Sequence, residues 1–213
     1  MIQDESLQIE KYSVINALLI SLCLVAFVWL AFLLNSIYDL NWNDYGLHPR
    51  NDVGLLGILT MPFLHADFKH LLSNSLPLLC LLFAIIYFFK QTALQILLLV
   101  FFFTGLLTWI IAKDGNHIGA SGIVYALAFF LTTISILKKE TRLMAYTLII
   151  VFLYGTIIWG FFPSLFPERH ISWQGHLSGA ITGTILAFLF RTKGPNKKIY
   201  FEDEDGDNNE DDT

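Results

Sequence analysis

The chain of 213 residues carries a formal net charge of −5, contains 55% apolar residues and has a mean hydropathy of +0.59. This composition is too apolar for an ordinary soluble domain, and the length suffices for several membrane spans, so we predict an integral, multi-pass membrane protein. The negative charge does not indicate a basic partner, because acidic residues gather in the tail at 201–213 and the rest of the chain is mildly basic.

The two ends of the chain are predicted to lie outside the membrane. The amino end is acidic where a signal peptide would be basic, and no clear cleavage site follows the first apolar run. We therefore expect that run to be retained as a span after a cytoplasmic segment, residues 1–13. Residues 191–213 have too little apolar surface to offset the entropy of ordering, so they are predicted to form a cytoplasmic, acidic, disordered tail.

Six apolar runs have the length of a membrane-spanning helix, which needs about 17–25 residues. They cover residues 14–34, 71–89, 92–112, 121–137, 143–162 and 175–190. The predicted fold is an all-α membrane protein, a bundle of six transmembrane helices that forms a core over residues 14–190. Cys23 and Cys80 lie inside these runs and indicate neither a disulfide framework nor a metal site.

The distribution of basic residues predicts the orientation of the bundle. Placing both termini inside puts nine Lys and Arg residues in the inner segments and four in the outer ones, namely Arg50, Lys69, Lys113 and Arg169. Positive charge favours the cytoplasmic side, so both termini are predicted to be cytoplasmic. The connection over residues 35–70 then becomes a long first external loop, and its semi-apolar part at 53–63 is expected to lie in the membrane interface.

Polar residues inside membrane spans are costly and are the first place to look for function. His70 and Asn74 are four residues apart in the second run and share one helix face. Ser121 begins the fourth run, and His176 lies at the start of the sixth. A rise of 1.5 Å per residue, counted from each inner border, places Ser121, His176 and Asn74 at one depth, roughly 22–25 Å from that border.

Small residues surround the serine and accompany the histidine. Gly119, Ala120 and Gly122 leave the hydroxyl of Ser121 uncrowded, as a nucleophile requires. In the sixth run, His176 starts a stripe with Gly179, Ala180, Gly183 and Ala187. This stripe overlaps Gly175, Gly179 and Gly183, which recur every four residues and predict close packing against another helix. The corresponding stripe in the fourth run consists of Ser121, Tyr125 and Ala128.

A serine, a histidine and further hydrogen-bond donors at one depth fit nucleophilic hydrolysis, in which the imidazole accepts the serine proton. No Asp or Glu occurs within the apolar runs. A two-residue Ser-His dyad is therefore predicted instead of a triad, and Tyr125 is expected to support the ring of His176 by stacking.

These motifs resemble the rhomboid intramembrane serine proteases. The motifs are the Gly119–Tyr125 segment, the His70-xxx-Asn74 pair and the Gly175-His176 pair with Gly179 and Gly183. The resemblance implies Ser121 as nucleophile and His176 as base, with His70, Asn74 and the backbone N–H of Ser121 forming the oxyanion hole. It also implies cleavage of transmembrane protein substrates within the lipid bilayer of a bacterial inner (plasma) membrane, with no cofactor and no nucleic acid. Phe68 and the first loop depart from the family pattern, which carries a tryptophan and a Trp-Arg pair there.

The remaining histidines have structural interpretations. His65 precedes the second run and is expected to hold the long loop by hydrogen bonds, while His48 and His117 are expected to be loop residues. A zinc site is not predicted, because His65 and His70 are five positions apart and would lie on different helix faces.

Two other functions compete with proteolysis. A catalytically silent rhomboid-like protein that binds membrane clients would typically lack the serine or the histidine, and both are present. A small transporter would usually show internal repeats and charged midplane residues, and neither is apparent.

Overall fold

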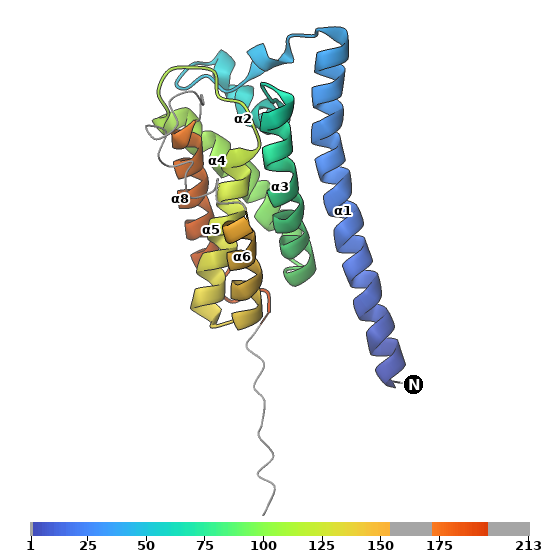
Figure 1. Cartoon of the computed structure of the whole chain (residues 1–213). Helices are drawn as coiled ribbons and strands as arrows, with labels where there is room; N and C mark the ends of the chain where they lie inside the picture. Colours follow the sequence, from blue (N-terminus) through green and yellow to red (C-terminus); the bar gives the residue numbers. More distant parts are fainter. Residues whose placement is uncertain (1, 154–171, 196–213) are drawn as a thin grey trace, which may run out of the picture.

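The computed structural model of the chain describes residues 2–153 and 172–195 (Figure 1). Within these residues every element of regular secondary structure is a helix, and one isolated antiparallel bridge joins Leu47 to His117. The α-helices are α1 Ile2–Tyr38, α2 Gly57–Thr60, α3 Phe68–Phe88, α4 Ala93–Ile111, α5 Ser121–Lys138, α6 Thr141–Leu153 and α8 Trp173–Leu189. Three short 3-10 helices are η1 Trp42–Tyr45, η2 Val53–Leu55 and η3 Met61–Phe63. The prediction of an all-α fold is confirmed for the described part of the chain.

Four of these helices are long and apolar enough to cross a membrane: α1 over Ser13–Tyr38, α3, α4 and α5. The protein is therefore an integral membrane protein. The predicted fifth run coincides in part with α6, but its residues 154–162 lie outside the described residues, as does the tail after residue 195. The predicted sixth run coincides with α8, which has 17 residues. The count of six spans stays a prediction.

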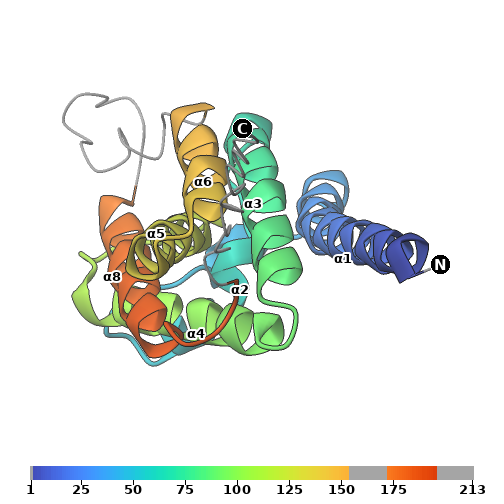
Figure 2. The same ribbon diagram turned by 90° about the horizontal axis from the view of Figure 1, so that it is seen from below.

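Helix α5 lies at the centre of the bundle, between α8, α4, α3 and α6, whereas α1 lies on the outside against α3 (Figure 2). Burial agrees with this arrangement, since 56% of the apolar window of α5 is buried and only 17% of that of α1. Helix α1 is continuous from Ile2 to Tyr38, and its candidate span, Ser13–Tyr38, starts close to the predicted first run and continues past the predicted end of that run at residue 34. The cytoplasmic placement of residues 1–13 stays a prediction.

The interface between α5 and α8 is a contact of backbones. A Cβ atom added at Gly179 would lie 2.1 Å from the carbonyl oxygen of Gly122, and one added at Gly183 would lie 2.0 Å from that of Ala126. Such distances are sterically forbidden, so only glycine fits at both positions. The α5 residues that meet these glycines are Gly122 and Ala126, which the predicted stripe of Ser121, Tyr125 and Ala128 did not include.

The segment between α1 and α3 folds back onto the end of the bundle where α5 and α8 begin. Its semi-apolar part forms η2, α2 and η3. The amide of Gly119 donates to the carbonyl of Met61 at 2.8 Å, and the Leu47–His117 bridge adds two hydrogen bonds of 2.9 Å. Arg50 donates to the carbonyls of Ile110 and Ala112. These contacts join the loop before α3 to residues 110–119, the segment that leads into α5.

Candidate active site

Ser121 is the first residue of α5 and follows a turn that requires glycine. Gly119 has φ of +115°, a conformation that residues with a side chain rarely adopt. A Cβ atom at this position would also lie 2.7 Å from the ring of His70 and 3.7 Å from the amide nitrogen of Asn74. The backbone just before Ser121 therefore lies directly against both side chains predicted for the oxyanion hole.

His176 is placed by the start of α8. The side chain of Ser172 caps this helix by accepting a hydrogen bond from the amide of Gly175 at 3.2 Å, and the carbonyl of Ser172 accepts one from the amide of His176. His176 is buried, and its Nε2 lies 2.9 Å from Oγ of Ser121. This distance is suitable for transfer of the hydroxyl proton to the imidazole.

Tyr125 lies one helical turn after Ser121 and covers one face of the histidine. The rings of Tyr125 and His176 are stacked, with centroids 4.1 Å apart and planes inclined by 7°. The stacking restricts rotation of the imidazole about its own axis. Together with the glycine-mediated contact of α5 and α8, it limits the positions that Nε2 can occupy relative to the serine.

Asn74 and His65 form a buried pair beside the serine. The amide nitrogen of Asn74 lies 3.2 Å from Nε2 of His65. An amide nitrogen can only donate, so His65 accepts through Nε2 and carries its proton on Nδ1. This bond orients the amide of Asn74 and leaves its second N–H available to another acceptor.

His65 stays neutral at physiological pH. Burial and, to a smaller extent, the neighbouring His70 lower the pKa of its imidazole from 6.5 to about 3. The rings of His65 and His70 have centroids 4.9 Å apart, so the expectation that five-residue spacing would separate them was wrong. The physical reason is that His65 precedes α3, which begins at Phe68, and helical spacing does not apply to it. His65 also contacts the long loop by a hydrogen bond, because the side-chain amide of Asn43 donates to the carbonyl of His65.

His117 connects the approach to α5 with the start of α8, a role that the sequence did not indicate. Its Nε2 lies 2.9 Å from the carbonyl of Lys113, and its Nδ1 lies 2.6 Å from the hydroxyl of Ser172. Because the carbonyl only accepts, Nε2 carries the proton and Nδ1 accepts from Ser172. The only sequence signal for this connection was Ser172 itself, a residue typical of a helix N-cap.

The structure thus brings together Ser121, His176, Tyr125, His70 and Asn74, all of which were predicted from the sequence. His65, also predicted from the sequence as a supporting residue, joins them through Asn74. The structure adds Ser172 and His117 through the start of α8. Among the described residues, no group of three His, Cys, Asp or Glu side chains is arranged to hold a metal ion. The arrangement can activate a serine hydroxyl and can present N–H donors next to it.

Comparison with known proteins assigns the same part of the chain to one family. The model of the Rhomboid domain matches residues 53–193, which begin after α1 and include every residue of the site. The chain is 32% identical over 183 residues to a protein of Mycobacterium bovis described as uncharacterized, a match covering 83% of this chain and 75% of that protein. An uncharacterized protein of Mycobacterium leprae is 31% identical over 184 residues, with coverage of 83% and 72%.

Proposed function

Because this chain belongs to the rhomboid family, we propose that it is an intramembrane serine endopeptidase that cleaves other membrane proteins in or near the external end of their transmembrane segments. The observation that carries the proposal is the distance of 2.9 Å between Oγ of Ser121 and Nε2 of His176, on two helices in backbone contact. No cofactor is required for this chemistry.

The reaction begins with Ser121 as nucleophile. His176 accepts the hydroxyl proton through Nε2 while Oγ attacks the carbonyl carbon of the scissile peptide bond. Tyr125 holds the imidazole plane during the transfer. His176 then donates this proton to the leaving amine, the C–N bond breaks, and an acyl-enzyme on Ser121 remains.

The oxyanion of the tetrahedral intermediate is stabilised by the side chains of His70 and Asn74 and by the backbone N–H of Ser121. The close approach of His70 and Asn74 to Gly119 supports this assignment. His65 acts through Asn74 as a positioning residue. Its Nε2 accepts a hydrogen bond from one N–H of the Asn74 amide, and this bond orients the second N–H. A water molecule then attacks the acyl-enzyme with His176 as base, which releases the second product and restores the serine.

The position of Ser121 at the start of α5 determines where substrates are cut. A peptide bond inside a stable helix is shielded by its own hydrogen bonds, so a substrate must unwind locally before attack. Unwinding in hydrocarbon leaves polar groups unpaired at several kcal/mol each. We expect substrates with glycine, proline or polar residues near the outer helix end, and cleavage after Ala, Ser or Gly, because the serine is flanked by small residues.

The orientation and location follow from the charge distribution. Both termini are placed in the cytoplasm by the excess of basic residues at that end of the helices, and the site then opens toward the outside. The relatives are bacterial, which supports an inner-membrane location. Proteolysis would release the external portion of a single-pass substrate.

The test combines a covalent probe with product mapping. Detergent-solubilised protein is treated with a serine-reactive fluorophosphonate, with Ser121→Ala as the control, and is mixed with a panel of single-span substrates whose products are identified by mass spectrometry. Labelling that requires Ser121, with cuts in the outer half of the substrate helix, is expected. Binding of substrates with neither labelling nor cleavage would establish instead the client-binding function of a silent relative.

A further inference from the structure

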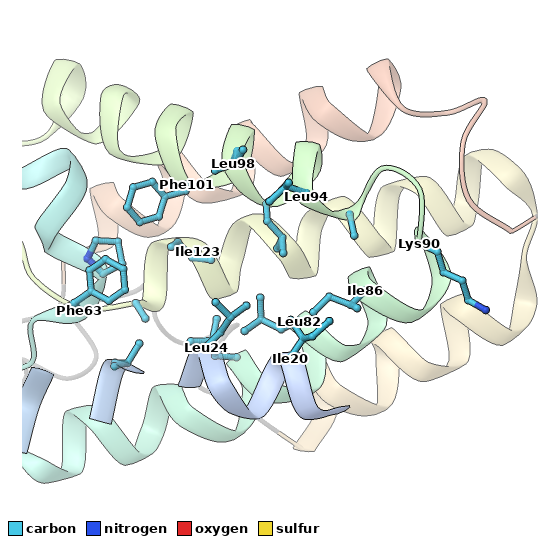
Figure 3. Close-up of a pocket in the computed structure, with 16 residues that line it drawn as sticks. Ile20, Leu24, Phe63, Leu82, Ile86, Lys90, Leu94, Leu98, Phe101 and Ile123 are labelled. Carbon is cyan, nitrogen blue, oxygen red and sulfur yellow. The ribbon is translucent and has the colours of Figure 1, made fainter. Parts of the chain in front are cut away.

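We propose that a groove between α1, α3 and α4 binds an acyl chain of an anionic phospholipid, with the lipid phosphate at Lys90. The groove, here called the α1–α4 groove, is a cavity of about 510 Å³ (Figure 3). It is separate from the Ser121–His176 pair, and the proposed protease function does not require it. Figure 3 shows Lys90 at one end of the groove and Phe63 near the other.

The lining of the groove is built from stripes of apolar residues at helical spacing. Ile20 and Leu24 come from α1, four residues apart, and Leu82 and Ile86 come from α3 at the same spacing. Residues four apart lie one above the other along a helix. The two helices therefore present parallel apolar walls, and the space between them is elongated along the helix axes.

The third wall leaves the groove open toward the membrane. Leu94 and Leu98 of α4 line the groove and are 70% and 59% exposed. Helix α1 packs on α3 and on η3. An apolar recess of this size is not hydrated favourably, since water needs polar partners, and in a bilayer the material at hand to fill it is hydrocarbon.

The length of the groove matches one leaflet. The helix rise gives about 18 Å from Lys90 to Leu78, the highest α3 residue of the lining, close to half of a hydrocarbon core that is about 30 Å thick. A second transmembrane helix would be about 10–12 Å wide, which is too wide for a groove of this volume. The occupant is thus an acyl chain that enters from the leaflet on the side of Lys90.

Charge at the entrance selects an anionic headgroup. Lys90 lies in the turn between α3 and α4, and its ammonium group is 5.5 Å from the ring centroid of Tyr87. No acidic side chain within residues 13–52, 54–153 and 172–195 forms an ion pair with it. The chain after α8 reaches the same turn, because Gly194 lies against the ring of Phe89, and this segment carries Lys193. Basic residues at a membrane surface attract anionic lipids by about 1 kcal/mol each.

The far end of the groove touches the segment that carries the proposed nucleophile. Ala120 and Ile123 both line it, one on each side of Ser121 in sequence. A bound acyl chain would therefore contact this segment beside the proposed nucleophile, and would support its position.

The experiment measures phospholipid binding to delipidated protein in a neutral detergent. Dioleoylphosphatidylglycerol and dioleoylphosphatidylcholine are titrated separately, with retention followed by native mass spectrometry and stability by thermal unfolding. For the unaltered chain we expect one retained phosphatidylglycerol and a rise in Tm of about 5–10 °C at 100 times the Kd. Phosphatidylcholine is expected to bind more weakly.

Two variants test the two halves of the site. Lys90→Gln should weaken phosphatidylglycerol binding about five-fold and reduce the preference over phosphatidylcholine, whereas Lys139→Gln, an exposed lysine at the same end, should not. Leu98→Trp should fill the groove and abolish retention of both lipids, whereas Leu72→Trp, on an exposed part of α3, should bind as the unaltered chain does. Wild-type binding by both Lys90→Gln and Leu98→Trp, or no saturable binding by the unaltered chain, would overturn the proposal.

Discussion

Helices α5 and α8 are packed through backbone contacts, whereas helices α1 and α3 are packed through side chains. Helices α5 and α8 touch through Gly122, Ala126, Gly179 and Gly183, with backbone atoms in contact. Helices α1 and α3 meet through larger side chains, such as Trp29 of α1, whose indole N–H donates to Ser75 of α3 at 2.9 Å, and they leave the α1–α4 groove beside them. Lipid is as apolar as leucine, so side-chain burial alone does not favour one helix position over another in a membrane. Backbone contact does favour one helix position. It occurs between the two helices that carry Ser121 and His176, whose side chains lie at hydrogen-bond distance.

The largest effect is expected from removing either member of the pair that α5 and α8 hold together. Ser121→Ala and His176→Ala should each lower kcat by about 10⁴-fold or more, and the double variant should lose little further activity, because the two residues act as a unit. Cleavage of a single-span substrate by purified protein provides the measurement. Substantial turnover by either single variant would refute the dyad.

Helix α3 contacts both α1 and α5. The predicted oxyanion donors, His70 and Asn74, lie on its side toward Gly119, just before α5. Asn74→Ala should lower kcat about 10²- to 10³-fold with little change in KM, since the donor acts on charge that develops in the transition state. His70→Ala should act in the same direction, and a mild result for one of them is acceptable because the donors can compensate for each other. Unchanged kcat in the double variant would place the oxyanion hole elsewhere.

The glycine contact itself is tested by adding volume to it. Gly183→Leu should separate α8 from α5, lower Tm by about 5–10 °C, as expected for overpacking by 1–3 kcal/mol, and reduce cleavage about 10²-fold through displacement of His176. Ile185→Leu, at a half-exposed position on the same helix, is the control and should change neither quantity. A Gly183→Leu variant with the melting curve of the unaltered protein would show that the interface is not tightly packed in solution.

A smaller effect is expected at the start of α8. Ser172→Ala removes the N-cap and the partner of Nδ1 of His117, and should cost about 1 kcal/mol of stability. We expect a decrease of kcat by about ten-fold, because His176 lies in the first turn of the helix and follows its position. Ser172→Thr keeps a hydroxyl and should retain most of the activity. If the activity of Ser172→Thr were as low as that of Ser172→Ala, the hydrogen bonds of the hydroxyl would not explain the decrease.

The smallest effect is expected in α1. Leu24→Ala truncates a side chain that is 42% exposed and lines the groove, so the protease activity should change by less than about two-fold. The same cleavage assay measures this. A loss comparable to that of Gly183→Leu would mean that α1 and α3 position the site as strictly as α5 and α8 do.

The sequence by itself determined the membrane class and the positions of most helices, and it predicted Ser121 and His176, which the structure brings within 2.9 Å of each other. A membrane span must satisfy its backbone polar groups internally and must be apolar over its full length, so a helix within the bilayer can be read from composition. The depth of Ser121, His176 and Asn74 could be counted along each run, because the helix rise is constant. Membership of the rhomboid family was predicted from the same motifs and is confirmed by the match over residues 53–193.

Only the tertiary structure decided which helix faces meet. Helical spacing groups residues on one face but does not say toward which neighbour that face turns. For this reason the stripe predicted in the fourth run, Ser121, Tyr125 and Ala128, did not include Gly122 and Ala126, which contact the glycines. Residues in loops have no fixed spacing, so the contacts of His65 with Asn74 and of His117 with Ser172 had no periodic signal. The groove beside α1 likewise depends on the distance between helices, which long-range packing sets and local sequence does not record.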